Sequence, residues 1–129
     1  MELPRGTETV LVVDDETMVR ELARDILKRY GYSVLTAAGG EEAVKLYQRH
    51  RGQVDAVVLD IQMPDVDGAE AFRRIRDIDP SARIILSSGY DQERSAEKLM
   101  HSGAAAFVQK PYRIAELLKA VRDVLDSRT

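Results

Sequence analysis

Cysteine is absent from the sequence, which excludes disulfide scaffolds, thiolate metal sites and catalysis by a thiol. No run of apolar residues approaches the length of a membrane span. An excess of basic charge is lacking as well. The formal net charge is −3, so we expect this segment to bind neither nucleic acid nor an anionic membrane. The first residues, Met1 to Gly6, lack the apolar stretch of a signal peptide, and a cytoplasmic location is the default expectation.

The composition is that of an ordinary globular protein, with 44% hydrophobic and 32% charged residues. A chain of 129 residues suits one domain, which can be stable without disulfides or a structural metal. We see no internal repeat, low-complexity tract or linker. The sequence therefore predicts one domain over residues 9–125, with a loosely held arm over 1–8 and a fraying tail over 126–129.

Short apolar runs alternate with longer amphipathic segments. The runs, which we predict to be strands, are Val10–Val13, Val34–Leu35, Ala56–Leu59, Ile84–Leu86 and Ala105–Val108. Most are apolar throughout, as parallel strands covered on both faces are. The segments between them show helical spacing of apolar residues, over 19–30, 43–47, 72–75, 92–102 and 114–125. This pattern predicts an α/β fold, an open doubly wound sheet of five parallel strands with five helices.

Reactive side chains lie where these strands end. They come from four separate strands and are Asp14, Asp15, Asp60, Ser87, Ser88 and Lys110. In open α/β sheets, ligands bind at the carboxyl ends of the strands. Any one such Asp, taken alone, is more often a helix cap or a turn former. Because all of them arise at the same edge of the predicted sheet, a shared site is the better interpretation.

Three carboxylates in one crevice repel each other, so each resists ionisation unless a cation lies among them. Ligands that are all oxygen atoms favour a hard divalent ion, and a few carboxylates with water fit Mg²⁺ better than zinc. A carboxylate can also act as a nucleophile toward phosphorus. Phosphoryl transfer to it needs positioning and charge neutralisation, which a metal, a lysine and a hydroxyl can supply.

The residues around these positions resemble the receiver domains of response regulators in two-component signalling. The resemblance spans Thr9 to Leu125 and is carried by four motifs: Leu11-Val12-Val13-Asp14-Asp15-Glu16, Leu59-Asp60-Ile61-Gln62-Met63-Pro64-Asp65-Val66-Asp67-Gly68, Ser87-Ser88-Gly89 and Lys110-Pro111-Tyr112. It implies a flavodoxin-like sheet with the strand order 2-1-3-4-5. It also implies a phospho-acceptor rather than an enzyme with turnover, with only Mg²⁺-dependent self-phosphorylation and slow dephosphorylation.

The resemblance assigns a role to each matching position. Asp60 is implied to be the phosphorylated residue. Asp15 is implied to bind Mg²⁺ directly and Asp14 mostly through water, with the backbone carbonyl of Gln62 completing the site. Lys110 is implied to pair with the phosphoryl oxygens, and the Lys110–Pro111 bond to be cis.

Two further residues are implied to form a switch. Ser88, which precedes the small residue Gly89, aligns with the switch hydroxyl, and Phe107 aligns with the aromatic side chain that rotates on activation. Ser88 replaces the more usual threonine, so its hydroxyl is less restricted in rotamer. By the same resemblance, Gln62 and Tyr90 lie at the two positions where the family tunes the lifetime of the phosphoryl group.

The resemblance also implies partners. A histidine kinase or a phosphotransfer protein would donate the phosphoryl group, and an output partner would bind the face formed by residues 92–102, 105–108 and 114–125. We expect a monomer or a weak homodimer. The segments Ser88-Gly89-Tyr90 and Phe107–Tyr112 resemble those of receiver modules in hybrid sensor kinases. A stand-alone regulator is the alternative interpretation.

Three alternatives fit the sequence less well. An aspartyl-phosphate phosphatase usually carries a second acid two residues after its nucleophile, where this chain has Gln62. A flavin-binding module needs a phosphate-cradling loop after the first strand, where Asp14-Asp15-Glu16 would repel a phosphate. An interaction domain that has lost phosphorylation is disfavoured because every reactive position is filled.

Overall fold

The computed structural model describes residues 2–89 and 93–127. Tyr90, to which a role in phosphoryl lifetime was assigned, and Gln92, the expected start of the fourth helix, lie outside the described residues. So do the last two residues of the predicted tail. None of the helices described is long and apolar enough to cross a membrane.

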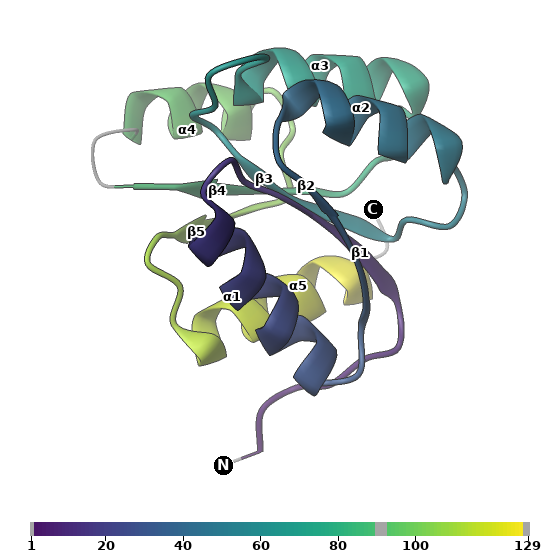
Figure 1. Ribbon diagram of the computed structural model, residues 1–129, viewed down its shortest axis with the longest axis vertical. Coiled ribbons are helices and arrows are strands. Elements are labelled where there is room, and N and C mark those ends of the chain that lie inside the picture. Colours follow the sequence, from purple (N-terminus) through teal and green to yellow (C-terminus); the bar gives the residue numbers. More distant parts are fainter. Residues whose placement is uncertain (1, 90–92, 128–129) are drawn as a thin grey trace.

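Five parallel strands form one sheet in the order β2-β1-β3-β4-β5, as the resemblance implied. The strands are β1 (Thr9–Val13), β2 (Ser33–Ala37), β3 (Ala56–Asp60), β4 (Ile84–Ser88) and β5 (Ala106–Gln109). The helices are α1 (Thr17–Arg29), α2 (Gly40–Arg49), α3 (Gly68–Ile78), α4 (Glu93–His101) and α5 (Ile114–Asp126). Helices α2, α3 and α4 cover one face of the sheet, and α1 and α5 cover the other (Figure 1). The predicted α/β fold is confirmed.

The apolar runs of the central strands form two separate cores. Leu11, Leu59 and Leu86 point into the core under α2, α3 and α4. Val12 and Val58, one position away in their strands, point into the core under α1 and α5. Because successive side chains of a strand point to opposite faces, a strand buried on both sides must be apolar at every position. This requirement explains the continuous runs in the sequence.

Helix ends follow the glycines, but the apolar stripes are narrower than the periodicity suggested. Gly31 and Gly103 both adopt φ of +105° just beyond α1 and α4, a left-handed conformation that favours glycine. Leu22 and Ile114, which the helical spacing counted with the buried faces, are exposed. Helical spacing indicates the direction of the buried face, but the neighbouring elements decide its width.

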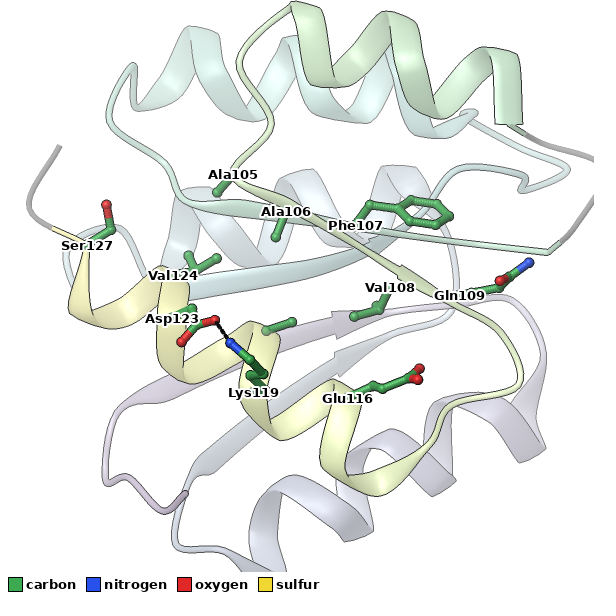
Figure 2. A pocket seen from close by; sticks show the side chains of 11 residues that line it. Ala105, Ala106, Phe107, Val108, Gln109, Glu116, Lys119, Asp123, Val124 and Ser127 are labelled. Atoms are coloured by element: carbon green, nitrogen blue, oxygen red, sulfur yellow. Dashed lines mark hydrogen bonds and ion pairs between the residues drawn. The ribbon is translucent and has the colours of Figure 1, made fainter. Parts of the chain in front are cut away.

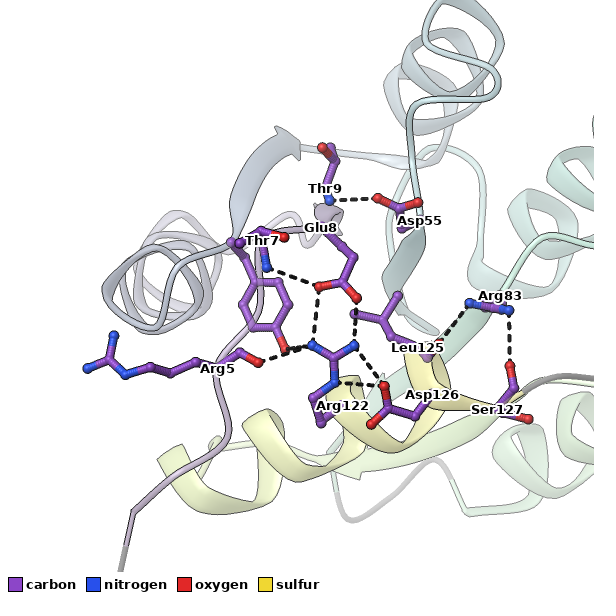
Figure 3. Close-up of polar contacts among 11 residues, drawn as sticks. Arg5, Thr7, Glu8, Thr9, Asp55, Arg83, Arg122, Leu125, Asp126 and Ser127 are labelled. Carbon is purple, nitrogen blue, oxygen red and sulfur yellow. Dashed lines mark hydrogen bonds and ion pairs between the residues drawn. The ribbon is translucent and has the colours of Figure 1, made fainter.

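The N-terminal arm, which the sequence predicts to be loosely held, makes several hydrogen bonds with the domain. Arg122 of α5 donates hydrogen bonds to the Glu8 carboxylate and to the Arg5 carbonyl, and it also contacts the Tyr32 hydroxyl (Figure 3). The Gly6 N–H donates to the Tyr30 carbonyl at 3.1 Å. Asp126, the first residue of the predicted tail, is the last residue of α5 and pairs with Arg122.

The close fit of the arm leaves no room for a side chain at two positions. A Cβ atom on Gly31 would lie 2.2 Å from the Gly6 carbonyl oxygen, and one on Gly6 would lie 2.4 Å from the Tyr32 ring. Leu3 packs against the core under α1 and α5, and the Arg5 guanidinium lies 5.2 Å from the centroid of the Tyr30 ring. The arm therefore joins the turn after α1 to the second half of α5.

We predict that the Glu8–Arg122 pair stabilises the fold by about 1 kcal/mol, because both side chains are partly shielded from solvent. Glu8→Gln and Arg122→Ala should each lower the free energy of unfolding, and the double variant should lose less than the sum. Hydrogen bonds from Arg122 lower the pKa of Glu8 to about 2. The contribution should therefore be complete above pH 4.5 and disappear as the pH falls toward 2.

Urea unfolding of the four proteins measures this coupling. The exposed Lys119–Asp123 pair on the same helix is the matched control, and its coupling should be near zero. A Glu8–Arg122 coupling no larger than that of Lys119–Asp123 would show that the arm is not held by this ion pair.

Candidate functional site

The predicted polar residues converge at the carboxyl edge of the sheet. An open pocket of about 480 Å³ lies there, lined by residues at the ends of four strands: Asp15, Glu16, Asp60, Gln62, Met63, Pro64, Gly89 and Lys110. Strand pairing sets this arrangement. Val13 of β1 is in register with Leu59 of β3, and Asp60 is in register with Ser87 of β4. Strands that run in parallel therefore release their last side chains into one crevice.

Two of the carboxylates are buried. Asp14 is 0% exposed and Asp60 is 2% exposed, whereas Asp15 is exposed at the mouth of the pocket. The Asp14 Oδ1 atom accepts a hydrogen bond from the Glu16 N–H at 2.9 Å. The Asp60 Oδ1 atom accepts one from the Gln62 N–H at 3.2 Å. Each buried carboxylate is thus oriented by the backbone of the loop that follows it.

Lys110 is the cation that faces these carboxylates. Its Nζ atom lies 3.2 Å from Asp14 Oδ2 and 3.2 Å from Asp60 Oδ2, and 3.8 Å from Glu16 Oε1. The Lys110–Pro111 peptide bond is cis, which confirms what the resemblance implied. The Lys110 N–H donates to the Ser88 carbonyl at 2.8 Å, so the lysine is held against the end of β4.

Burial dominates the acid-base behaviour of the site. Desolvation and the neighbouring Asp14 raise the pKa of Asp60 to about 7, although Lys110 opposes both effects. Burial tends to lower the pKa of Lys110, but the Asp60 and Asp14 carboxylates outweigh it and raise that pKa. The single ammonium group therefore does not fully offset two carboxylates in a poorly solvated place.

The residues present fit a divalent cation. Asp14, Asp15 and Asp60 each offer a carboxylate oxygen, and these oxygens lie within 4.8 Å of one another. Asp60 Oδ2 is buried and accepts no hydrogen bond from the described residues, although Lys110 Nζ lies nearby. The Lys110 ammonium offsets part of the cost of burying this acceptor, and a further cation or donor would offset more of it. Oxygen donors of this kind suit Mg²⁺.

The two serines at the end of β4 face opposite sides of the sheet. Ser87 forms a 2.6 Å hydrogen bond with the Tyr112 hydroxyl, on the side of α1 and α5. Ser88 is also buried, and its hydroxyl donates to the adjacent Gly89 carbonyl at 2.8 Å rather than to Asp60. Ser88 is thus near the pocket but engaged locally.

Phe107 lies apart from the acidic pocket, on the edge strand β5. It is in register with Leu86, and its side chain is 38% exposed. A shallow cavity of about 380 Å³ beside α4 is lined by Phe107 together with Ala96, Met100 and other residues of α4. The structure thus brings Asp14, Asp15, Asp60, Gln62 and Lys110 together, and places Phe107 outward at some distance.

Sequence reasoning missed three residues near the site. Glu16 lines the pocket and faces Lys110, Arg20 donates to the Asp14 carbonyl at 2.8 Å, and Tyr112 contacts Ser87. Glu16 and Tyr112 belong to the motifs that carry the family resemblance, so their position beside reactive residues was a usable signal. The position of Arg20, the fourth residue of α1 and so about one helical turn into it, was a weaker one.

Comparisons with known proteins match the geometry. A family model described as "Response regulator receiver domain" matches residues 10–122. The chain is 36% identical over 118 residues to the chemotaxis protein CheY of Bacillus subtilis, covering 91% of this chain and 97% of CheY. It is 35% identical over 123 residues to the sensor kinase CckA of Brucella abortus, covering 95% of this chain but 13% of the kinase.

A solved structure shows the same fold. The chain superposes with a TM-score of 0.87 on a chain of the CheX–CheY–BeF3–Mg²⁺ complex from Borrelia burgdorferi. The sequences are 35% identical, and the match covers 93% of this chain and 90% of the other. Size, topology and sequence therefore agree over nearly the whole chain.

We predict that Asp60→Asn stabilises the protein in EDTA at pH 7.5, by roughly 2 kcal/mol, because it removes a buried charge that Asp14 repels. The pKa of Asp60 in the folded state, about 7, lies above the value of 3.8 that is usual for an aspartate. Folding therefore favours the protonated form, so the cost is present above pH 7 and fades as the pH falls toward 4. The difference in unfolding free energy between the two proteins should shrink over the same range.

Urea unfolding monitored by circular dichroism at several pH values provides the measurement. Asp15→Asn, a change at the exposed carboxylate of the same pocket, is the matched control and should have a smaller effect. If Asp60→Asn were the less stable protein at pH 7.5 in EDTA, the repulsion argument would be wrong.

Proposed function

We propose that Asp60 is the phosphoryl acceptor of this chain, from the premise that the chain belongs to the response regulator receiver domain family, the phospho-accepting domains of two-component systems. The observation that carries the proposal is the buried Asp60 Oδ2 atom, which faces Lys110 in a pocket and accepts no hydrogen bond from the described residues. The donor would be the phosphohistidine of a histidine kinase or phosphotransfer protein, in the cytoplasm.

Phosphoryl transfer to Asp60 requires little acid-base catalysis by side chains of this chain. A carboxylate oxygen of Asp60 forms a bond to phosphorus while the phosphorus–nitrogen bond of the phosphohistidine breaks, and the imidazole leaves with its electron pair and takes up a proton. Lys110, which lies 3.2 Å from Asp60 Oδ2, would pair with the oxygens of the transferred phosphoryl group. We propose no further turnover by this domain beyond gain and slow loss of the phosphoryl group.

A divalent cation, which we propose to be Mg²⁺, supplies neutralisation of the phosphoryl oxygens when bound. Asp15 and Asp60 would hold it directly, Asp14 would act mainly through water, and the Gln62 carbonyl would add a neutral oxygen. The three carboxylates whose oxygens lie within 4.8 Å of one another support this assignment. Lys110 pairs with both buried carboxylates in the described structure and would have to share them with the cation.

Phosphorylation should add one phosphoryl group to the wild-type protein and none to Asp60→Asn. Phosphoramidate with MgCl2 supplies the group, and intact-protein mass spectrometry detects it. Asp67→Asn, a change in the same loop at the residue that caps α3, is the matched control and should still be labelled. Undiminished labelling of Asp60→Asn, or of wild type in EDTA, would refute the assignment.

We further propose that Ser88 couples the phosphoryl group to Phe107. The group brings up to two negative charges and three acceptor oxygens. The Ser88 hydroxyl, which now donates to the Gly89 carbonyl, would turn toward them because a charge-assisted hydrogen bond is stronger. Phe107, half-exposed beside α4, could then rotate into the space behind β4. The phosphoryl group can shift the equilibrium between these two conformations only by as much as it interacts more favourably with one of them.

The output partner would bind the face formed by α4, β5 and α5. An open groove of about 680 Å³ lies between β5 and α5. Figure 2 shows the side chains that line it, with Phe107 projecting from the strand. Glu116, Lys119 and Asp123 supply charge of both signs along the helix side. This mixed polar surface on an edge strand suits a protein partner that binds reversibly. We also propose that the protein is a monomer or a weak homodimer.

Ser88→Ala should retain labelling of Asp60 but weaken the response of Phe107 and α4. Beryllofluoride, which stands in for the phosphoryl group on the carboxylate, allows backbone amide shifts to be compared with and without it. Ser87→Ala is the matched control, because it removes the neighbouring hydroxyl that contacts Tyr112 on the other face. Equal, large shifts around Phe107 in wild type and Ser88→Ala would exclude Ser88 as the relay.

A further inference from the structure

The loop from Ile61 to Asp67 joins the acceptor strand to α3 and forms one wall of the acidic pocket. Gln62, Met63 and Pro64 of this loop line the pocket, and Met63 is buried in the core. Both ends of the loop are secured. The Ile61 N–H donates to the Ser87 carbonyl at 3.0 Å, and the Gly68 N–H donates back to the Ile61 carbonyl at 2.7 Å.

The middle of the loop is secured by Asp65, at a distant helix. Its two carboxylate oxygens accept hydrogen bonds from the N–H groups of Gly40 at 3.2 Å and Glu41 at 3.3 Å. The N-cap residue of α2 is Gly39, which has no side chain to offer its own helix. Asp65, 25 positions along the chain from Gly40, therefore serves as the cap of α2.

The steric fit at the same place is an independent observation. A Cβ atom on Gly40 would lie 2.4 Å from the Val66 carbonyl oxygen, and one on Gly39 would lie 2.7 Å from an Asp65 carboxylate oxygen. Both glycines are buried. The loop thus lies directly against the start of α2, and its backbone position there is defined by contact as well as by hydrogen bonds.

From this arrangement we propose that Asp65 is a positioning residue for the metal site. It does not touch the pocket, but it holds the loop segment whose Gln62 carbonyl the proposed function assigns to the cation, and the inference rests on that function. Gln62 itself is exposed, so packing of its side chain does little to hold it. A carbonyl can serve as a ligand only if its peptide plane keeps one orientation, and residues that orient ligands contribute strongly to metal affinity.

Asp65→Ala should weaken Mg²⁺ binding by about tenfold, in line with the loss of other residues that orient metal ligands. Titration of the folded protein with MgCl2, followed by the amide shifts of Asp15 and Gln62, gives the affinity. The Mg²⁺ concentration for half-maximal labelling by phosphoramidate should rise by the same factor, with the maximal rate unchanged. If Asp65 had only a structural role, Asp65→Ala would lower the stability of the fold but would not raise the Mg²⁺ concentration needed for half-maximal labelling.

Three variants separate positioning from charge and from loss of a cap. Asp67→Ala removes the same charge and a helix cap from the same loop, and should change Mg²⁺ affinity by no more than about twofold because exposed charges are screened. Asp65→Asn keeps an acceptor and should fall between wild type and Asp65→Ala. Gly40→Ala pushes on the loop from α2, and should weaken Mg²⁺ binding although alanine favours helix.

The outcomes are distinguishable. Wild-type affinity in Asp65→Ala, or an equal loss in Asp65→Ala and Asp67→Ala, would overturn the positioning role while leaving the proposed function intact. If Asp65→Ala did not fold, Asp65→Asn and Gly40→Ala would decide by the same criterion. If wild type bound no Mg²⁺ and took no phosphoryl group, the proposed function would fall, and this inference with it.

Discussion

The repulsion between two buried carboxylates is the constraint on which this molecule depends. Asp14 directly follows β1 and Asp60 ends β3, the neighbouring parallel strand, so the sheet itself forces them together. Lys110 contacts both at 3.2 Å and offsets part of the repulsion. The remainder is an excess of negative charge in a place with little water. That excess favours the presence of a further positive charge in the pocket.

Much of the fold and the site could be predicted because both follow from local patterns. Continuous apolar runs such as Ala56–Leu59 indicate strands buried on both faces, and parallel strands deliver the residues after them to one edge. The sequence therefore predicts that Asp14, Asp60 and Lys110 lie in one site. The strand order and the cis bond before Pro111 came only from the family resemblance.

The rest depends on contacts between distant residues, which no local pattern encodes. Glu8 and Arg122 are 114 positions apart, and each alone reads as an ordinary exposed charge. Asp65 stands in a turn sequence, where an aspartate commonly bonds its own backbone, yet it caps α2. Leu22 has helical spacing with its buried neighbours but lies outside the contact area of α1. Tertiary packing decided each case.

The alternation of side chains along β4 has one more consequence. Ser87 and Ser88 differ by a single step in the chain, but one hydroxyl meets Tyr112 under α1 and α5 and the other belongs to the layer of α4. Insertion or deletion of one residue within β4 would exchange the two layers they address. Alignment of this strand between relatives therefore has to be exact to the residue, since a gap placed one position off would assign the hydroxyl of the α4 layer to the layer of α1 and α5.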